Sequence, residues 1–421
     1  MTLFKTAIWT GISTVIKIIF NYLMWKIIAV YTGPVGLAVI EQFQNFLQIA
    51  RSFSSSLNQG IIKYVSEFKH DEDKKSLVLS SAFPVSIFIA IVVSIILICF
   101  SNEFSLKIFH SLDYSRTIKI LAVSITLYSL NGLLLSVLNG EFEIKKYVAS
   151  NISNTLLIFA LTVYLVMHYG IQGGLIGFVF NQSVSLLLTV YLVVKSKWFK
   201  LSSYVSGIDK RTLVKLIRYS FISFAPVLIV PITLIIMRKF IASQLSWQEA
   251  GYWQGIMRLS EAYIILLEVM VNIYFLPKIS SIKTLAEFKA EVFSTYRLVI
   301  PVAIIGLLFV FVFKKQIVMI LYDKQFFPML CLFKYQLIGD LAKIGAWLLM
   351  IIMAAKAMVK VLVISEIIFN ITLLIFTFIC VHYFGLIGTS IGFAINNVLC
   401  LISMSFWTMR CVRNGSFRLV T

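Results

Sequence analysis

Long apolar runs alternate with short polar connections along the whole chain. Each run provides the roughly 20 residues that a helix needs to cross about 30 Å of hydrocarbon. The pattern predicts an all-α integral membrane protein with about twelve transmembrane helices, over residues 4–31, 34–66, 77–100, 117–140, 147–168, 173–194, 213–242, 249–276, 292–314, 328–355, 360–382 and 384–409.

Composition points the same way. Of the 421 residues, 60% are hydrophobic and only 13% are charged, which is about half the usual charged share. The mean hydropathy is +0.94. The net charge of +19 comes from short loops rather than from one basic block, so we expect no nucleic-acid partner.

The basic loops fall on one side of the membrane when the spans alternate in direction. They lie at residues 69–75, 145–146, 195–211, 278–289 and 356–360, with the tail from 410. The positive-inside rule places this side, and therefore both termini, in the cytoplasm. The exceptions on the other side are residues 238–239 and 314–315.

The longest polar connection divides the spans into six and six. It predicts an N-terminal lobe at residues 1–194, a cytoplasmic interlobe linker at 195–212, a C-terminal lobe at 213–409 and a cytoplasmic tail at 410–421. With an even number of spans, each lobe has the same orientation in the membrane.

The two lobes also resemble each other in sequence. Residues 168–181 match 382–396, and the pentapeptide TLLIF occurs at both Thr155 and Thr372, all at an offset of about 215 residues. Glycine-rich turns that look alike everywhere would explain the shared glycines, but not Asn181 and Asn396. We expect a parallel repeat about the membrane normal, with the two lobes around a central cavity that holds the substrate.

Several spans carry polar residues that are costly inside a membrane and usually face a cavity or a partner. Ser13, Lys17 and Asn21 are spaced to share one helix face. The expected cations of the cavity are Lys17, Arg51, Arg258, Lys334 and Lys343, and its acids are Glu41, Glu261, Glu268, Asp340 and Glu366. Lys26 either reaches the cavity through a bend or extends to the outer interface.

Mutual pairing of these charges is the plain alternative, with Arg258 on Glu261 and Asp340 on Lys343. Lys17 has no carboxylate on its own helix face. A diphosphate would satisfy it, because lysine is a good point-charge phosphate ligand. The acids are candidates for ion coupling, since protonation would change the charge of the cavity.

Enzyme chemistry is not indicated. The chain has no phosphate-binding loop of the Walker type and no GxSxG, and its four histidines and five cysteines show no metal-ligand spacing. We expect no catalytic residue, no metal and no cofactor.

Five segments resemble the Wzx-type flippases of undecaprenyl-diphosphate-linked oligosaccharides, in the multidrug/oligosaccharidyl-lipid/polysaccharide exporter (MOP) superfamily. They are Leu3–Thr14 with Lys17 and Lys26, Gly33–Leu37, Ser246–Gly255, Ser260–Tyr263 and Gln336–Ala346. The branches that handle O-antigen and enterobacterial common antigen (lipid III) units are most similar. Lys17, Lys26, Asp340 and Lys343 match family positions, whereas Arg51 and Arg258 come from the helix faces alone.

The resemblance implies a flippase of the bacterial inner membrane for lipopolysaccharide-type biosynthesis. It would move a lipid-linked repeat unit from the cytoplasmic to the periplasmic leaflet by alternating access. The polysaccharide polymerase and the chain-length machinery are candidate partners. An ion-coupled multidrug or metabolite antiporter would favour a carboxylate-rich cavity, a membrane glycosyl polymerase would need a long outer loop, and a structural protein would not need ionisable groups at mid-membrane.

Overall fold

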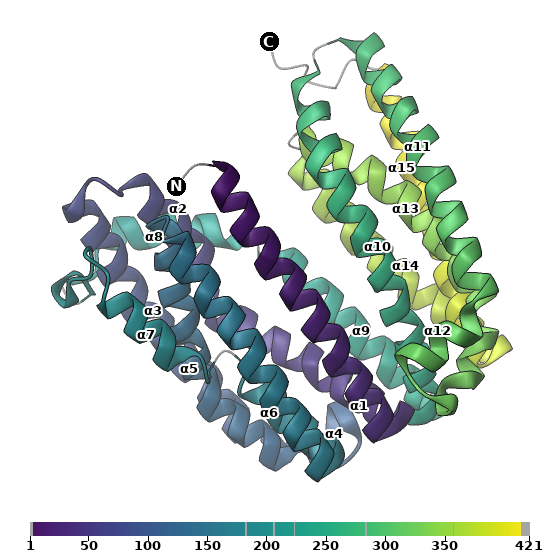
Figure 1. Cartoon of the computed structure of the whole chain (residues 1–421), viewed down its shortest axis with the longest axis horizontal. Helices are drawn as coiled ribbons and strands as arrows, with labels where there is room; N and C mark the ends of the chain where they lie inside the picture. The colour runs from purple at the N-terminus through teal and green to yellow at the C-terminus, as the bar shows by residue number, and fades with distance from the viewer. Residues whose placement is uncertain are drawn as a thin grey trace. The chain divides into compact units, whose positions relative to one another are not determined.

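The computed structural model describes residues 3–181, 183–204, 207–222, 224–282, 284–356 and 358–413. All regular structure in these ranges is helical (Figure 1). The first half holds α1 (Leu3–Ser54), α2 (Asn58–Glu67), α3 (Glu72–Cys99), α4 (Ser101–Phe109), α5 (Ser115–Gly140), α6 (Ile144–Val179), α7 (Leu186–Val194), η1 (Leu201–Tyr204) and α8 (Lys210–Ile222). The second half holds α9 (Phe224–Gln244), α10 (Trp247–Ser281), α11 (Leu285–Val312), α12 (Lys314–Leu321), η2 (Lys324–Cys331), α13 (Phe333–Ala355), α14 (Val359–Phe384) and α15 (Leu386–Arg413).

Nine helices of the described ranges are long and apolar enough to cross a membrane. Two of them contain a reversal of the chain, at Gly33 in α1 and at Gly170 in α6. Counting both arms of α1, the second arm of α6 together with α7, and the more polar α10, the expected twelve spans are all accounted for. The chain is therefore a multi-pass membrane protein.

The helices form two compact units. Unit 1 comprises residues 1–32 and 39–235, and unit 2 comprises residues 33–38 and 236–421. The predicted lobe boundary at 195–212 stays a prediction. By contacts, residues 195–235 lie with unit 1. The span expected at residues 213–242 is covered by α8, which is described up to Ile222, and by α9, which is described from Phe224.

Each unit has one helix at its centre. In unit 1 it is α5, which packs on α2, α3, α6 and α7, and in unit 2 it is α13, which packs on α10, α11, α14 and α15. Helices α3 and α11 expose large apolar side chains such as Phe88 and Ile305. Such faces are suited to contact with hydrocarbon, whereas in water they would promote aggregation.

The internal repeat is visible in matched turns. Gly170 has φ 55° and ψ −131°, and Gly385 has φ 58° and ψ −137°, a conformation that only glycine adopts readily. Three residues further on, a Cβ at Gly173 would lie 1.9 Å from the Leu165 carbonyl oxygen, and one at Gly388 would lie 2.1 Å from that of Cys380.

Two further pairs extend the match. Gly177 lies against Thr162, and Gly392 lies against Thr377, at the same spacing of fifteen residues in both units. The shared asparagines also act alike. The Oδ1 of Asn181 accepts from Asn154 at 3.2 Å, and that of Asn396 accepts from Thr372 at 2.7 Å. Each asparagine thus links the two arms of its helical hairpin.

The segment predicted as an interlobe linker is fixed to unit 1. Lys200 pairs with Glu72 at 2.5 Å, and the Tyr204 ring packs edge-on against Phe83. The backbone N–H of Asp209 donates to Ser81 Oγ at 2.9 Å. Hydrogen bonds from Thr212 hold the pKa of the Asp209 carboxyl below its usual value, so this carboxylate is well suited to cap α8.

We predict that Gly173→Ala and Gly388→Ala each lower the thermal stability of the purified protein. The new methyl group would overlap a backbone carbonyl, and such overpacking costs about 1–3 kcal/mol. The control is Gly306→Ala in α11, where a Cβ meets nothing within 4 Å. Equal melting temperatures for Gly173→Ala and Gly306→Ala would contradict the close packing.

Candidate functional site

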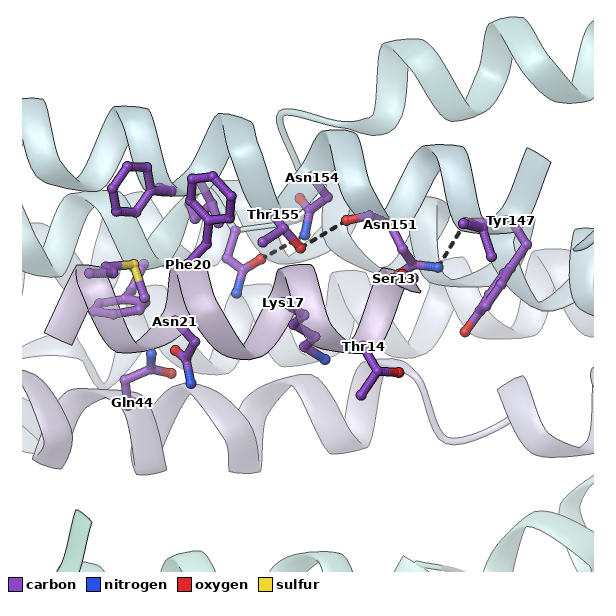
Figure 2. Close-up of a pocket in the computed structure, with 16 residues that line it drawn as sticks. Ser13, Thr14, Lys17, Phe20, Asn21, Gln44, Tyr147, Asn151, Asn154 and Thr155 are labelled. Carbon is purple, nitrogen blue, oxygen red and sulfur yellow. Dashed lines mark hydrogen bonds between the residues drawn. The ribbon is translucent and has the colours of Figure 1, made fainter. Parts of the chain in front are cut away.

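A cavity of about 330 Å³ lies within unit 1, between α1 and α6. Figure 2 shows its walls. It is lined by Ser13, Thr14, Lys17, Phe20, Asn21, Met24, Gln44, Tyr147, Val148, Asn151, Asn154, Thr155, Ile158, Phe159, Phe178 and Asn181. This volume falls in the range of small-molecule binding sites.

The first arm of α1 supplies one wall. Ser13, Lys17 and Asn21 follow one another at four-residue spacing, so a helix places them on the same face. All three line the cavity. Gln44 joins them from the second arm of α1, because the chain reverses at Gly33.

The facing wall comes from α6 and was missed by the sequence reasoning. Tyr147, Asn151 and Asn154 are spaced four and three apart and point into the same space (Figure 2). The Asn151 amide donates to the Tyr147 carbonyl oxygen at 2.9 Å, and the Asn154 amide donates to Asn181 at 3.2 Å. That spacing was a usable signal, but uncharged amides in a helix are easily taken for packing residues.

Lys17 carries the only charge among the described residues that line the cavity. Its side chain is exposed to the cavity, and no described residue forms a hydrogen bond or an ion pair with its ammonium group. An ammonium in a space lined by hydroxyls and amides, without a carboxylate, is suited to an anionic ligand. The neutral groups around it can donate to and accept from hydroxyls.

Aromatic residues close one end of the cavity. Phe20 of α1 meets Phe159 of α6 edge to face, with ring centroids 4.9 Å apart. Trp25 stacks on Phe178 at 5.2 Å, and its indole N–H donates to Asn21. The ring contacts hold α1 against α6, and the hydrogen bond from Trp25 fixes the Asn21 side-chain oxygen.

Arg51 is engaged inside unit 1. Its guanidinium donates to the Phe178 carbonyl oxygen at 2.6 Å and lies over the Tyr128 ring at 4.7 Å. Phe178 lies in the last turn of α6, where carbonyl groups lack helical partners. We therefore assign Arg51 a structural contact with the end of α6, next to the cavity wall.

Asp340 lies at the centre of a buried polar network in unit 2. Its carboxylate accepts from Ser260 at 2.9 Å and from the Tyr263 hydroxyl, and Gln336 approaches it at 3.5 Å. Ser390 of α15 donates to the Gln336 side chain at 3.2 Å. Within the described ranges the hydrogen-bond partners of Asp340 are uncharged, and Lys343, its partner in the plain alternative, is not among them.

The other predicted site residues fall into two groups. Lys26 is exposed and Glu41 is buried, both in unit 1. The rest lie in unit 2, where Lys334 and Glu261 are exposed and Arg258, Lys343 and Glu366 are half-buried. The side chain of Glu268 lies outside the described part of the chain. Whether these groups share one cavity with Lys17 stays a prediction.

One buried cation was not foreseen. Arg238 of α9 is fully buried in unit 2, donates to Gln254 Oε1 at 2.6 Å, and faces the Trp253 ring at 5.6 Å. The sequence placed it near the outer end of the span 213–242, as one of the few basic residues on that side. In the structure α9 continues to Gln244, so Arg238 is inside a helix.

The fold defines the class of protein. The chain superposes on an inward-facing MATE-family multidrug resistance transporter of the MOP superfamily with a TM-score of 0.79 and 13% identity, covering 93% of this chain and 94% of that one. It is also 23% identical to the lipid III flippases of Escherichia coli K12 and Shigella flexneri, over 93% of this chain and 94% of each relative.

The polysaccharide biosynthesis protein family matches residues 3–283, which include the whole cavity of unit 1. The chain belongs to this family. Its fold is that of the MOP-superfamily transporters, as the sequence predicted.

We predict different stability effects for the two cations of α1. Arg51→Met should lower the melting temperature, because the Phe178 carbonyl loses a charged hydrogen bond worth about 1.5–3 kcal/mol. Lys17→Met should leave it nearly unchanged, because no described residue depends on that ammonium. The measurement is thermal unfolding of both variants in detergent; a larger loss for Lys17→Met would contradict the assignment of roles.

Proposed function

We propose that this protein is a flippase for undecaprenyl-diphosphate-linked oligosaccharides of the O-antigen or enterobacterial common antigen type. The observation that carries the proposal is the cavity of unit 1, in which Lys17 is surrounded by hydroxyl and amide groups. The names of the two curated relatives, both lipid III flippases, support it. Membership of the polysaccharide biosynthesis protein family also supports a role in making a polysaccharide.

The cargo explains why such a cavity is needed. A diphosphate and several sugars would lose their hydration in hydrocarbon, and unpaired polar groups there are very costly. Lys17 would neutralise part of the diphosphate charge. Asn151, Asn154 and Tyr147 would replace water around the sugar hydroxyls, while the polyprenyl tail stays in lipid.

The charge of the cavity also separates this cargo from the alternative. A carrier of cationic drugs would favour a carboxylate-rich cavity, whereas Lys17 would repel a cation. The structural likeness to multidrug transporters concerns the fold, and one fold serves many cargoes.

The proposal also covers the orientation of the protein in the membrane and its partner proteins. We infer an inner-membrane location with both termini in the cytoplasm, from the basic loops. Transport would then run from the cytoplasmic to the periplasmic leaflet by alternating access of the two lobes. The polymerase and the chain-length machinery would take up the product.

The proposal predicts that Lys17→Ala loses most flipping at native protein levels, while Lys17→Arg keeps part of it. A charged hydrogen bond is worth about 1.5–3 kcal/mol, or roughly 10- to 100-fold in affinity. The assay is complementation of a deletion strain, with accumulation of unpolymerised lipid-linked oligosaccharide as the readout. Lys119→Ala, which removes an exposed lysine outside the cavity, is the control.

Arg258→Ala and Lys343→Ala test the cations of unit 2 in the same assay. We expect both to reduce flipping. Full complementation by these two and by Lys17→Ala, at equal expression, would show that the cations are structural and that the phosphate site is wrong.

Asp340 is the acid we propose for ion coupling, ahead of Glu41 and Glu366, because its hydroxyl partners can serve a carboxylate or a carboxylic acid. In proteoliposomes, a pH gradient should accelerate flipping by the wild type but not by Asp340→Asn. Glu366→Gln is the control at a half-buried position. An undiminished response in Asp340→Asn would remove Asp340 from the coupling step.

A further inference from the structure

The cavity of unit 1 changes in character along α1. Ser13, Thr14 and Lys17 line it first, and Phe20 and Met24 line it further along the helix. At a rise of about 1.5 Å per residue, the first and last of these positions lie about 16 Å apart. Lys17 therefore has hydroxyl groups toward one end of the cavity and apolar side chains toward the other (Figure 2).

Helix α6 repeats this order on the facing wall. Tyr147 and Asn151 line the polar end, and Ile158 and Phe159 line the other end. The Phe159 ring meets the Phe20 ring edge to face, with centroids 4.9 Å apart, so the apolar parts of the two helices face each other. The cavity thus has a polar end, a cationic middle and an apolar end.

The apolar end is suited to hydrocarbon. Five apolar side chains form it, namely those of Phe20, Met24, Ile158, Phe159 and Phe178. Met24, Ile158 and Phe178 are buried, and the other two are half-buried. None of these five side chains can donate a hydrogen bond. Burying hydrocarbon against them is favourable, whereas a sugar hydroxyl buried there would lose the hydrogen bonds that it makes in water.

Contacts around the apolar end hold its surface in place. Asn21 and Gln44 border it from α1. The Asn21 Oδ1 atom accepts from the Trp25 indole N–H at 3.1 Å, and the Trp25 ring stacks on Phe178 at 5.2 Å. Arg51 donates to the Phe178 carbonyl oxygen at 2.6 Å. Phe178 is therefore fixed on both its ring and its backbone, as a preformed binding surface requires.

We propose that the apolar end of this cavity is a subsite for the first isoprene unit of a polyprenyl diphosphate. The order apolar, cationic, polar along the cavity matches the covalent order isoprene, diphosphate, sugar. This subsite rests on the proposed function and gives the cargo a direction. The first isoprene unit lies against Phe20 and Phe159, the diphosphate lies on Lys17, and the first sugar lies toward Tyr147 and Asn151. The remaining isoprene units stay in lipid.

The test compares two soluble diphosphates of equal charge, dimethylallyl diphosphate and methyl diphosphate. Their binding to the full chain in detergent is measured by isothermal titration calorimetry. Dimethylallyl diphosphate carries a complete isoprene unit, and methyl diphosphate lacks most of it. Each buried methylene strengthens binding roughly fourfold, so the wild type should bind dimethylallyl diphosphate about tenfold more tightly or better.

Phe20→Ser should abolish this preference, because it replaces apolar surface of the subsite with a hydroxyl group. Phe88→Ser is the matched control. It changes an exposed phenylalanine of α3 that does not line the cavity, and it should keep the preference. The affinity of each variant for methyl diphosphate reports whether its phosphate site is intact.

Three results would overturn the isoprene subsite: equal affinities of the wild type for the two probes, an unchanged preference in Phe20→Ser, or an equal loss in Phe88→Ser. The first of these does not depend on the folding of any variant. Lys17→Ala tests the proposed function separately, because it should weaken the binding of both probes alike. If it weakens neither, the phosphate site is wrong. If it weakens both, but the wild type binds them equally, only the isoprene subsite is wrong.

Discussion

The backbone and side chains of this protein obey one constraint: a polar group inside hydrocarbon must find a partner or water. Helices satisfy the backbone, which is why the described ranges hold no other regular structure. The side chains divide into those that are paired and those that line a space. Arg51, Arg238 and Asp340 have partners inside their units, whereas Lys17 faces the cavity of unit 1. That difference, rather than the presence of charge, singles out Lys17.

Close contact between consecutive helices allows this arrangement. Gly173 and Gly388 bring a helix onto the backbone of the one before it, and small residues at such contacts are typical of membrane helix packing. In unit 1 the same hairpin carries the asparagines of the cavity wall. The repeated hairpin therefore forms one wall of the cavity, and Asn151 and Asn154 are the residues it supplies.

Much of the fold, and one wall of the cavity, could be predicted from the sequence, because the signals are local. Apolar runs predict the spans, and the spacing of Ser13, Lys17 and Asn21 predicts their shared face. Contacts between distant segments leave no such pattern. Arg51 and Phe178 are 127 residues apart, and Lys200 and Glu72 are 128 apart, so neither the role of Arg51 nor the docking of residues 195–209 could be foreseen. The turns at Gly33 and Gly170, in contrast, lie where the hydropathy pattern separates two spans.

The reversal in α1 has a mechanical consequence. Residues 33–38 belong to unit 2, and Pro34 is held there by Gly251, whose Cβ would lie 2.0 Å from the Pro34 carbonyl oxygen. The arms of α1 on either side belong to unit 1. A rotation of one unit against the other must therefore be absorbed by backbone torsions at the two ends of this six-residue segment and within α9. The arm of α1 that carries Lys17 therefore continues, through its turn, into a segment that packs within unit 2.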